Sequence, residues 1–332
     1  MTDATQPSSK TRRMPSMSVL GPILALVVLI LIGALLNPNF LSAGNITNVL
    51  ARSAFIGIIA VGMTFVITAG GLDLSVGSMA AFIAGLMILV MNAALPTMGV
   101  GVPIILLGMA VALVAGLLAG LLNGYLITAL GIEAFIVTLG SMGIYRSLVT
   151  WLADGGTLSL DFSLRTFYRP VYFDGILGIS WPIIVFALVV IIGEIVMSRS
   201  VYGRHCAATG SNEEVARYSN VSVKRTRLIS YAALGVLVGI ATIMYVPRLG
   251  SASSSTGVLW ELEAIAAVII GGTALKGGFG RVWGTVIGVL ILTLIGNILN
   301  LTDFVSPYLN GAIQGVIIIL AVILQREGKS AS

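Results

Sequence analysis

Very few side chains in this sequence could carry out acid–base, nucleophilic or metal chemistry. Its 332 residues include one histidine and one cysteine, His205 and Cys206, which are neighbours. A metal site needs more ligands than these two, and a catalytic nucleophile needs a base within reach. Glu261 and Glu263 are two positions apart, so on a helix they face different sides and do not form an acid–base pair. The sequence therefore predicts neither an enzyme nor a metal site.

The glycine-rich segments also lack the pattern of a nucleotide site. Residues 276–281 contain three glycines but not G-x-x-x-x-G-K-[ST], the pattern whose backbone cradles phosphate. Residues 328–330 are Gly-Lys-Ser, but Ile323 stands where the first glycine of that pattern would be. We therefore expect this chain to bind no nucleotide or other cofactor.

A carboxylate follows a pair of glycines between two apolar blocks. Gly70 and Gly71 allow backbone angles that other residues avoid, and Asp73 can cap the next helix, whose start includes Ser75. A tight, capped turn explains part of this pattern. Because a carboxylate this close to a membrane is costly, Asp73 is also expected to be paired or functional.

Arg146 lies inside a long apolar block. From Glu133 to Arg146 a helix rises roughly 20 Å, which leaves the guanidinium short of the far membrane surface. The side chain either extends outward to water, or it binds a partner inside the bundle or on a substrate path. The sequence leaves both alternatives open.

Residues 199–227 form the longest polar, charge-dense segment, with six of the 18 Lys and Arg residues. Ser211 and Glu214 fit a capping box, with acids at the start of a short helix and Arg217 near its end. Val215 and Tyr218 give this helix one apolar side. About two turns are too short to be stable alone in water. The helix therefore packs either under its own bundle or on a soluble partner.

The surrounding chain has the composition of an integral membrane protein. Apolar residues make up 57% and charged residues 9%, against about 25% charged in soluble domains, and the mean hydropathy is +1.05. The apolar blocks have the length of membrane-spanning helices rather than the alternation of barrel strands. We expect an all-α polytopic protein with about ten transmembrane helices. The expected spans are 19–36, 54–69, 75–92, 101–123, 133–152, 181–198, 228–247, 259–275, 282–300 and 308–325.

These blocks divide the chain into a disordered cytoplasmic tail at 1–18, one membrane domain at 19–325 and a short tail at 326–332. A cleaved signal peptide is the alternative for the N-terminal block, but its apolar run is long and no A-x-A site follows.

The distribution of basic residues sets the expected orientation. With an even number of spans before residue 199, segments on the inside carry 13 Lys and Arg residues and those on the outside carry four. This asymmetry follows the positive-inside rule and places both termini in the cytoplasm. The net charge of +5 is explained by this topology, so we expect no nucleic-acid partner. The outer loop at 153–180 is rich in aromatic residues, which form either an interfacial belt or a partner contact.

Several motifs together resemble the permease subunits of ribose-type ABC sugar importers. They are Ile67–Ser78, Phe135–Leu139 with Arg146, the run Glu261–Gly272, Gly277–Arg281 with Gly284 and Thr285, and Gly203–Ser219. They occur in the same order and spacing from about residue 36 to 325. The sequence departs from that family at Ala207, usually aromatic there, and at Ser211 and Asn220, usually glycine.

The resemblance implies a bacterial inner-membrane permease that works as a pair, with cytoplasmic ATPase subunits that bind ATP and Mg and with a periplasmic sugar-binding protein. The cargo would be a monosaccharide or related polyol, such as ribose, xylose, galactose or inositol. It implies that residues 211–218 couple to the ATPase; these are Ser211, Asn212, Glu213, Glu214, Val215, Ala216, Arg217 and Tyr218. Candidates for the signature turn and the path are Gly70, Gly71, Asp73, Ser75, Arg146, Glu261 and Glu263.

Four aromatic residues could stack on a sugar ring or serve only as interfacial anchors. They are Tyr145, Trp151, Tyr245 and Trp260. The alternative function is an ion-coupled secondary transporter of a small polar solute. Such proteins place ionisable residues on broken helices near the midplane. Here the acids stand at the ends of the apolar blocks, which counts against that alternative.

Overall fold

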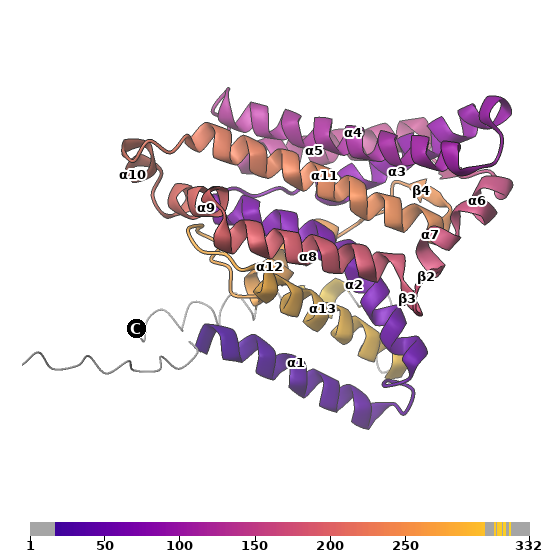
Figure 1. Cartoon of the computed structure of the whole chain (residues 1–332), viewed down its shortest axis with the longest axis horizontal. Helices are drawn as coiled ribbons and strands as arrows, with labels where there is room; N and C mark the ends of the chain where they lie inside the picture. Colours follow the sequence, from indigo (N-terminus) through magenta and orange to yellow (C-terminus); the bar gives the residue numbers. More distant parts are fainter. Residues whose placement is uncertain (1–16, 303–308, 310, 314, 317–318, 320–332) are drawn as a thin grey trace, which may run out of the picture.

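The computed structural model describes residues 17–302, together with 309, 311–313, 315–316 and 319. In chain order its elements are α1 Met17–Leu36, α2 Ala43–Thr68, α3 Val76–Met98, α4 Val102–Thr128, α5 Ala134–Leu152, β1 Thr157–Ser159, α6 Phe162–Tyr168, α7 Pro170–Phe173, β2 Gly175–Ile176, β3 Ile179–Ser180, α8 Trp181–Arg199, α9 Val201–Ser211, α10 Glu213–Tyr218, α11 Val223–Leu249, β4 Ser251–Ser253, α12 Trp260–Ile270 and α13 Val282–Thr302. The long helices run side by side, with α1 at one edge and α4 at the other (Figure 1).

Seven helices in the described part are long and apolar enough to cross a membrane. They are α2, α3, α4, α5, α8, α11 and α13. Their bounds agree with the expected spans to within a few residues, except that α2 begins at Ala43, eleven residues before the expected block. This confirms an all-α polytopic membrane protein. The expected last span, 308–325, lies largely outside the described residues.

The block at 259–275 differs from the expectation of a full span. Its helix, α12, has 11 residues and a length of about 17 Å, against a hydrocarbon core of roughly 30 Å. Left-handed backbone at Gly257 and Leu259 precedes the helix, and Gly272 adopts the same region after it. Apolar composition indicates burial but not backbone conformation, so the sequence pattern predicted a continuous helix where the chain has a half-helix followed by a non-helical turn.

Small residues bring α4 and α11 into direct backbone contact. A Cβ atom on Gly116 would lie 2.2 Å from the carbonyl oxygen of Gly235, and one on Gly120 would lie 2.3 Å from that of Tyr231. Such positions accept only glycine without a shift of one helix. Close approach of this kind is how small residues stabilise helix pairs in membranes.

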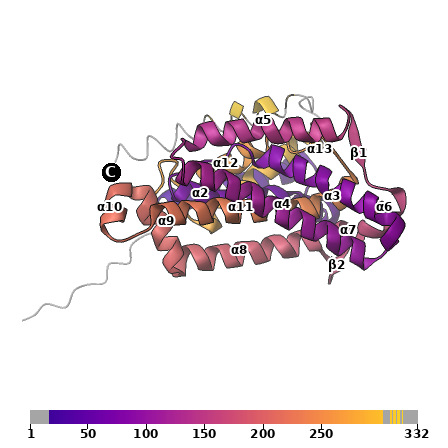
Figure 2. The same ribbon diagram turned by 90° about the horizontal axis from the view of Figure 1, so that it is seen from above.

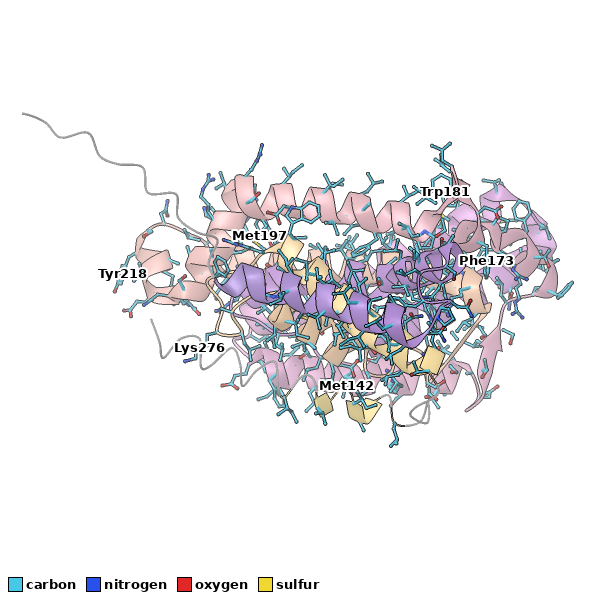
Figure 3. All side chains as sticks on the ribbon, turned by 90° about the horizontal axis from the view of Figure 1, so that it is seen from below. Met142, Phe173, Trp181, Met197, Tyr218 and Lys276 are labelled. Atoms are coloured by element: carbon cyan, nitrogen blue, oxygen red, sulfur yellow. The ribbon has the colours of Figure 1, made fainter. Side chains whose placement is uncertain are left out.

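The two ends of the bundle are different. One end carries α9 and α10, with Tyr218 at its tip, and we call it the α10 end (Figures 1 and 3). The other end carries α6, α7 and the short strands, and we call it the α6 end (Figures 1 and 2). There β1 pairs with β4 in antiparallel register, which joins the 153–180 loop to the segment that leads to α12.

Two aromatic residues of the 153–180 loop pack on the bundle itself, a role that neither of the two expectations named. Tyr168 is buried and donates a hydrogen bond of 2.8 Å to the carbonyl oxygen of Ile243, and Tyr172 stacks on Phe55 of α2. Phe162 is exposed on the outer surface. The loop is therefore anchored on the bundle through two tyrosines.

Candidate coupling segment and transport path

The short helix expected near residue 211 is present as α10, but its cap differs from the expectation. Helix α9 continues through Ser211, so Ser211 is not the N-cap. Asn212 has extended backbone, and its side-chain oxygen accepts a hydrogen bond of 3.0 Å from the amide of Val215. The predicted capping box of Ser211 with Glu214 is therefore wrong, because the chain offers a second good cap residue one position later.

The apolar side of α10 faces away from the bundle. Val215 is 58% exposed and Tyr218 is 83% exposed, whereas Ala216 on the opposite side is buried. Figure 3 shows Tyr218 at the extreme tip of the α10 end. Helix α10 thus packs on its own bundle through Ala216, as one alternative held, while Val215 and Tyr218 do not take part in that packing.

The inner side of α10 is tied to the end of α2 by charged groups. Glu213 pairs with Arg217 one turn along the helix and, at 3.0 Å, with Arg227 at the start of α11. Arg227 also donates from Nε to the carbonyl oxygen of Ala69, at 3.2 Å. Arg227 therefore joins α10 to the first residue after α2.

Glycines allow three segments to meet at this point. The amide of Gly278 donates a hydrogen bond of 2.9 Å to the carbonyl oxygen of Thr68. A Cβ atom on Gly210 would lie 2.0 Å from the same oxygen and 2.5 Å from the amide nitrogen of Gly278. The end of α9, the end of α2 and the turn at 274–281 therefore touch through their backbones.

The turn at 69–75 is held in an extended form that enters the bundle. The hydroxyl of Tyr231 accepts from the amide of Leu72 at 3.2 Å and donates to the carbonyl oxygen of Leu72 at 2.9 Å. A Cβ atom on Gly71 would lie 2.8 Å from that hydroxyl oxygen, so Gly71 is required by this contact. Gly70 adopts a positive φ of 77°, which explains the other glycine of the pair.

Asp73 is fully buried and is paired, as one expectation held. One carboxylate oxygen accepts from the amide of Ser75 at 2.8 Å and from its hydroxyl at 2.6 Å. The other accepts from the side-chain amide of Asn123 at 3.1 Å, and Ser141 donates to the oxygen of Asn123 at 2.6 Å. Asp73 thus begins a polar network that joins α3, α4 and α5 inside the bundle.

The start of α3 packs against the segment that leads to α12. A Cβ atom on Gly77 would lie 2.1 Å from the carbonyl oxygen of Gly257 and 2.4 Å from Oε2 of Glu261. Within the described part, this Glu261 oxygen is buried and has no hydrogen-bond partner. The two helices that begin inside the bundle, α3 and α12, are therefore in contact at their first turns.

Arg146 has its partner inside the protein. Its guanidinium donates to the carbonyl oxygen of Ser254 at 2.7 Å and to that of Thr256. This contact ties α5 to the loop before α12, so extension of the side chain toward water is not needed to explain Arg146.

The four aromatic residues that could stack on a sugar do not lie together. Tyr145 is buried and stacks on Phe82, with ring centroids 5.7 Å apart, and Trp151 is 72% exposed. Tyr245 and Trp260 are adjacent and perpendicular, with centroids 5.0 Å apart. The structure therefore separates one pair, Tyr245 and Trp260, from the other two.

Tyr245 and Trp260 line a cavity of about 340 Å³ together with Glu263. Arg52, Arg248 and Asn297 line it as well, and none of the three was singled out from the sequence. Arg52 and Asn297 are isolated polar residues within or beside apolar blocks, a signal that marks functional positions in membranes and that could have identified them.

His205 and Cys206 lie in α9, and the described residues contain no group of three or more His, Cys, Asp or Glu that could hold a metal ion. Cys206 is buried, and burial raises the pKa of its thiol. The expectation that nucleotide binds to another subunit stays a prediction.

Residues 45–322 match the family described as "Branched-chain amino acid transport system / permease component". The chain is 39% identical over 329 residues to the ribose import permease protein RbsC of Bacillus subtilis, covering 95% of this chain and 94% of that protein. It is 36% identical over 301 residues to RbsC of Haemophilus influenzae, covering 90% of each. Over 351 residues it is 31% identical to the xylose transport system permease protein XylH of Escherichia coli, covering 88% of this chain and 87% of that protein.

These comparisons confirm the resemblance that the motifs indicated, and they cover nearly the whole chain. They support a permease component and not an enzyme, and nothing among them supports an ion-coupled transporter. The chain belongs to the family of branched-chain amino acid transport system permease components, and within it is similar to the ribose and xylose permeases.

Proposed function

We propose that this chain is the membrane-spanning subunit of an ATP-driven importer of a pentose such as ribose, and that α10 receives the movement of a cytoplasmic ATPase. The observation that carries the proposal is the exposed apolar side of α10 combined with its charged inner side, which reaches Ala69 through Arg227. A short helix that exposes Val215 and Tyr218 offers a docking surface, and its inner contacts give the docked partner a mechanical connection to the bundle.

The mechanism follows from the segments in contact. Closure of the ATPase subunits would displace α10, and Glu213 with Arg227 would pass that displacement to the turn at 69–75. This turn leads into α3, and the first turn of α3 touches the first turn of α12. The first turns of α3 and α12 would therefore move together. Packed interfaces of this kind switch between discrete arrangements rather than deforming continuously. The result would be alternating access for a cargo delivered from the α6 end.

The cargo class rests on the relatives rather than on the family description. The family description names branched-chain amino acids, whereas the relatives named for ribose and xylose share 31–39% identity with this chain. Uptake of labelled ribose, xylose and leucine by the reconstituted complex distinguishes these classes. Uptake of leucine in preference to either sugar would contradict the proposed cargo.

Charge reversal on α10 tests coupling. With Glu214→Arg and Arg217→Glu, we expect ATP hydrolysis to continue while sugar uptake per ATP falls, since the docking geometry changes and Glu213 loses one partner. Transport and ATPase assays on the same assembled complex measure both quantities. Unchanged coupling in both variants would remove the role assigned to this helix.

A matched pair of apolar-to-charged variants tests docking. Val215→Asp should weaken co-purification of the ATPase subunits, because it places a charge on the exposed side of α10. Leu177→Asp is the control, since Leu177 is also an exposed aliphatic residue, like Val215, but lies at the α6 end. Equal assembly of the two variants with the ATPase would contradict docking at α10.

We further propose that the chain crosses the bacterial inner membrane ten times with both termini in the cytoplasm, as one of two permease copies, together with a periplasmic binding protein. One of these crossings is made by the loop at 254–259 and the half-helix α12 together, since β4 pairs with β1 at the α6 end and Gly278 bonds to Thr68 at the α10 end. The basic residues gathered near α10 support the orientation under the positive-inside rule. Two cysteine variants in a Cys206→Ala background test this orientation with a thiol-reactive reagent that cannot cross the membrane. Tyr218→Cys should react only from the inner side, and Phe162→Cys should react only from the outer side.

A further inference from the structure

The cavity lined by Tyr245 and Trp260 has features that the coupling mechanism does not use. It lies between α2, α11, α12 and α13, in the half of the bundle near the α6 end, since Arg52 stands near the start of α2 and Arg248 near the end of α11. Its volume of about 340 Å³ falls at the lower end of small-molecule sites, which span roughly 300–1,000 Å³. That size suits one sugar ring.

One wall of the cavity is aromatic and fixed in place. Trp260 stacks on Phe55 with nearly parallel rings and centroids 6.5 Å apart, and Tyr245 packs edge-on against both. These mutual contacts hold the rings without a ligand. The face of an aromatic ring carries partial negative charge, which attracts the C–H bonds on the flat side of a pyranose or furanose.

The rest of the cavity supplies both hydrogen-bond donors and acceptors. Arg52 and Arg248 are donors only and Glu263 is an acceptor, while the side-chain amide of Asn297 exchanges two hydrogen bonds with that of Asn45, of 2.8 and 3.0 Å. Within the described part, Arg52 makes no hydrogen bond or ion pair with the protein. A sugar hydroxyl both donates and accepts, so a run of hydroxyls can meet donors and an acceptor together, whereas an aliphatic side chain would offer the Arg52 guanidinium no hydrogen bond.

The half-helix α12 aims its first turn into the cavity. Trp260 and Glu263 belong to that turn, and the chain before it is a non-helical loop in which Thr256 and Gly257 are buried while Val258 and Leu259 are exposed. In membrane transporters, discontinuous helices of this type place polar groups and backbone dipoles at the cargo site. The same first turn contacts Gly77 of α3, so a ligand in the cavity would lie next to the moving segments.

We propose that the cavity lined by Arg52, Tyr245, Arg248, Trp260, Glu263 and Asn297 binds a single neutral sugar during its passage through the membrane. This inference rests on the proposed function and makes the permease itself, and not only an external binding protein, a determinant of the cargo. The Trp260 ring contacts the flat side of the sugar, and Arg52 and Glu263 bind its hydroxyls from the edge.

Direct binding tests the site independently of transport. Labelled D-ribose and D-xylose are titrated onto the purified permease–ATPase complex in nanodiscs, without any binding protein. We expect saturable binding by the wild type. The sugar affinity of Trp260→Leu and Glu263→Gln should be at least about tenfold lower than that of the wild type, and the affinity of Trp260→Phe should be close to it. Trp181→Leu is the control, because Trp181 lies at the α6 end outside the cavity (Figure 3).

Each outcome separates the site from the proposed function. Absence of saturable sugar binding by the wild type, or equal binding by Trp260→Leu, Glu263→Gln and the wild type, would overturn the site even if ATP-driven uptake is observed. Trp260→Phe and the thermal stability of each variant distinguish loss of a contact from misfolding. Saturable, Trp260-dependent binding in a complex that shows no ATP-driven uptake would support the site and contradict only the proposed function.

Discussion

Arg227 lies 3.0 Å from the carboxylate of Glu213, and its Nε donates to the backbone of Ala69. One side chain thus joins a solvent-facing helix to the turn that enters the bundle. Both members of the ion pair are partly exposed, so the pair itself contributes little to stability, about 0–1 kcal/mol. Its geometry, rather than its energy, makes it suited to pass on a movement.

Replacement of Arg227 tests this connection. Arg227→Ala should lower the sugar imported per ATP several-fold while leaving the melting temperature of the complex almost unchanged. Arg227→Lys should give an intermediate value, because it keeps a charge for Glu213 but cannot reproduce the Nε hydrogen bond to Ala69. Parallel uptake and ATPase assays measure the ratio. A fall in melting temperature equal for both variants, with uptake per ATP preserved, would instead indicate a purely structural role.

The glycine contact between α9 and α2 makes a steric prediction. Gly210→Ala should destabilise the protein by about 1–3 kcal/mol, since the new Cβ atom would meet the carbonyl oxygen of Thr68 at 2.0 Å. Gly143→Ala in α5 is the matched control, because its Cβ would meet nothing within 4 Å, and it should be neutral or stabilising by up to about 1 kcal/mol. Thermal unfolding in detergent ranks the two. Equal melting temperatures would show that the segments are not in contact.

Arg146 should hold the loop before α12. With Arg146→Met, the carbonyl groups of Ser254 and Thr256 lose a charged donor, at a cost of about 2 kcal/mol. We expect faster proteolysis of residues 251–259 and a lower melting temperature. Arg146→Lys should recover part of the loss, because an ammonium can reach one of the two carbonyl oxygens. Proteolysis of this loop at the wild-type rate in Arg146→Met would contradict the role.

Cys206 gives a pH-dependent test of the packing around α9. Burial raises the pKa of its thiol, so the reactive thiolate is scarcer at neutral pH than in an exposed cysteine. Maleimide labelling should be slow at pH 7 and should rise with pH over a range higher than that of an ordinary thiol. Tyr218→Cys in a Cys206→Ala background is the exposed reference. Labelling of Cys206 as fast as this reference would show that α9 is not packed as described.

Hydropathy predicted most of the fold because membrane spans are defined by length and apolar composition. It failed at α12, where an equally apolar block is a half-helix followed by a turn. The start of this helix depends on Gly257, Leu259 and the contact with Gly77. The helix cap moved from Ser211 to Asn212 because both residues are good caps and only packing decides between them. Asn220, one of the departures from the family resemblance, adopts a positive φ of 59°, which asparagine tolerates.

For the candidate site, too, the sequence indicated some residues and not their partners. The sequence singled out Asp73, Glu263 and Trp260 as candidates, but their partners come from other helices and leave no mark in the local sequence. Asn123 and Ser141 complete the Asp73 network from α4 and α5. Such long-range pairings depend on which helices pack together, and no local pattern in a single sequence records that.

The most direct test is to measure which energy source drives sugar uptake by the complete complex in proteoliposomes. We expect labelled ribose to accumulate only when ATP is present on the side of the membrane that α10 faces. We also expect this accumulation to persist after all ion gradients are collapsed. Accumulation driven by a proton or sodium gradient without ATP would contradict it and would favour an ion-coupled transporter.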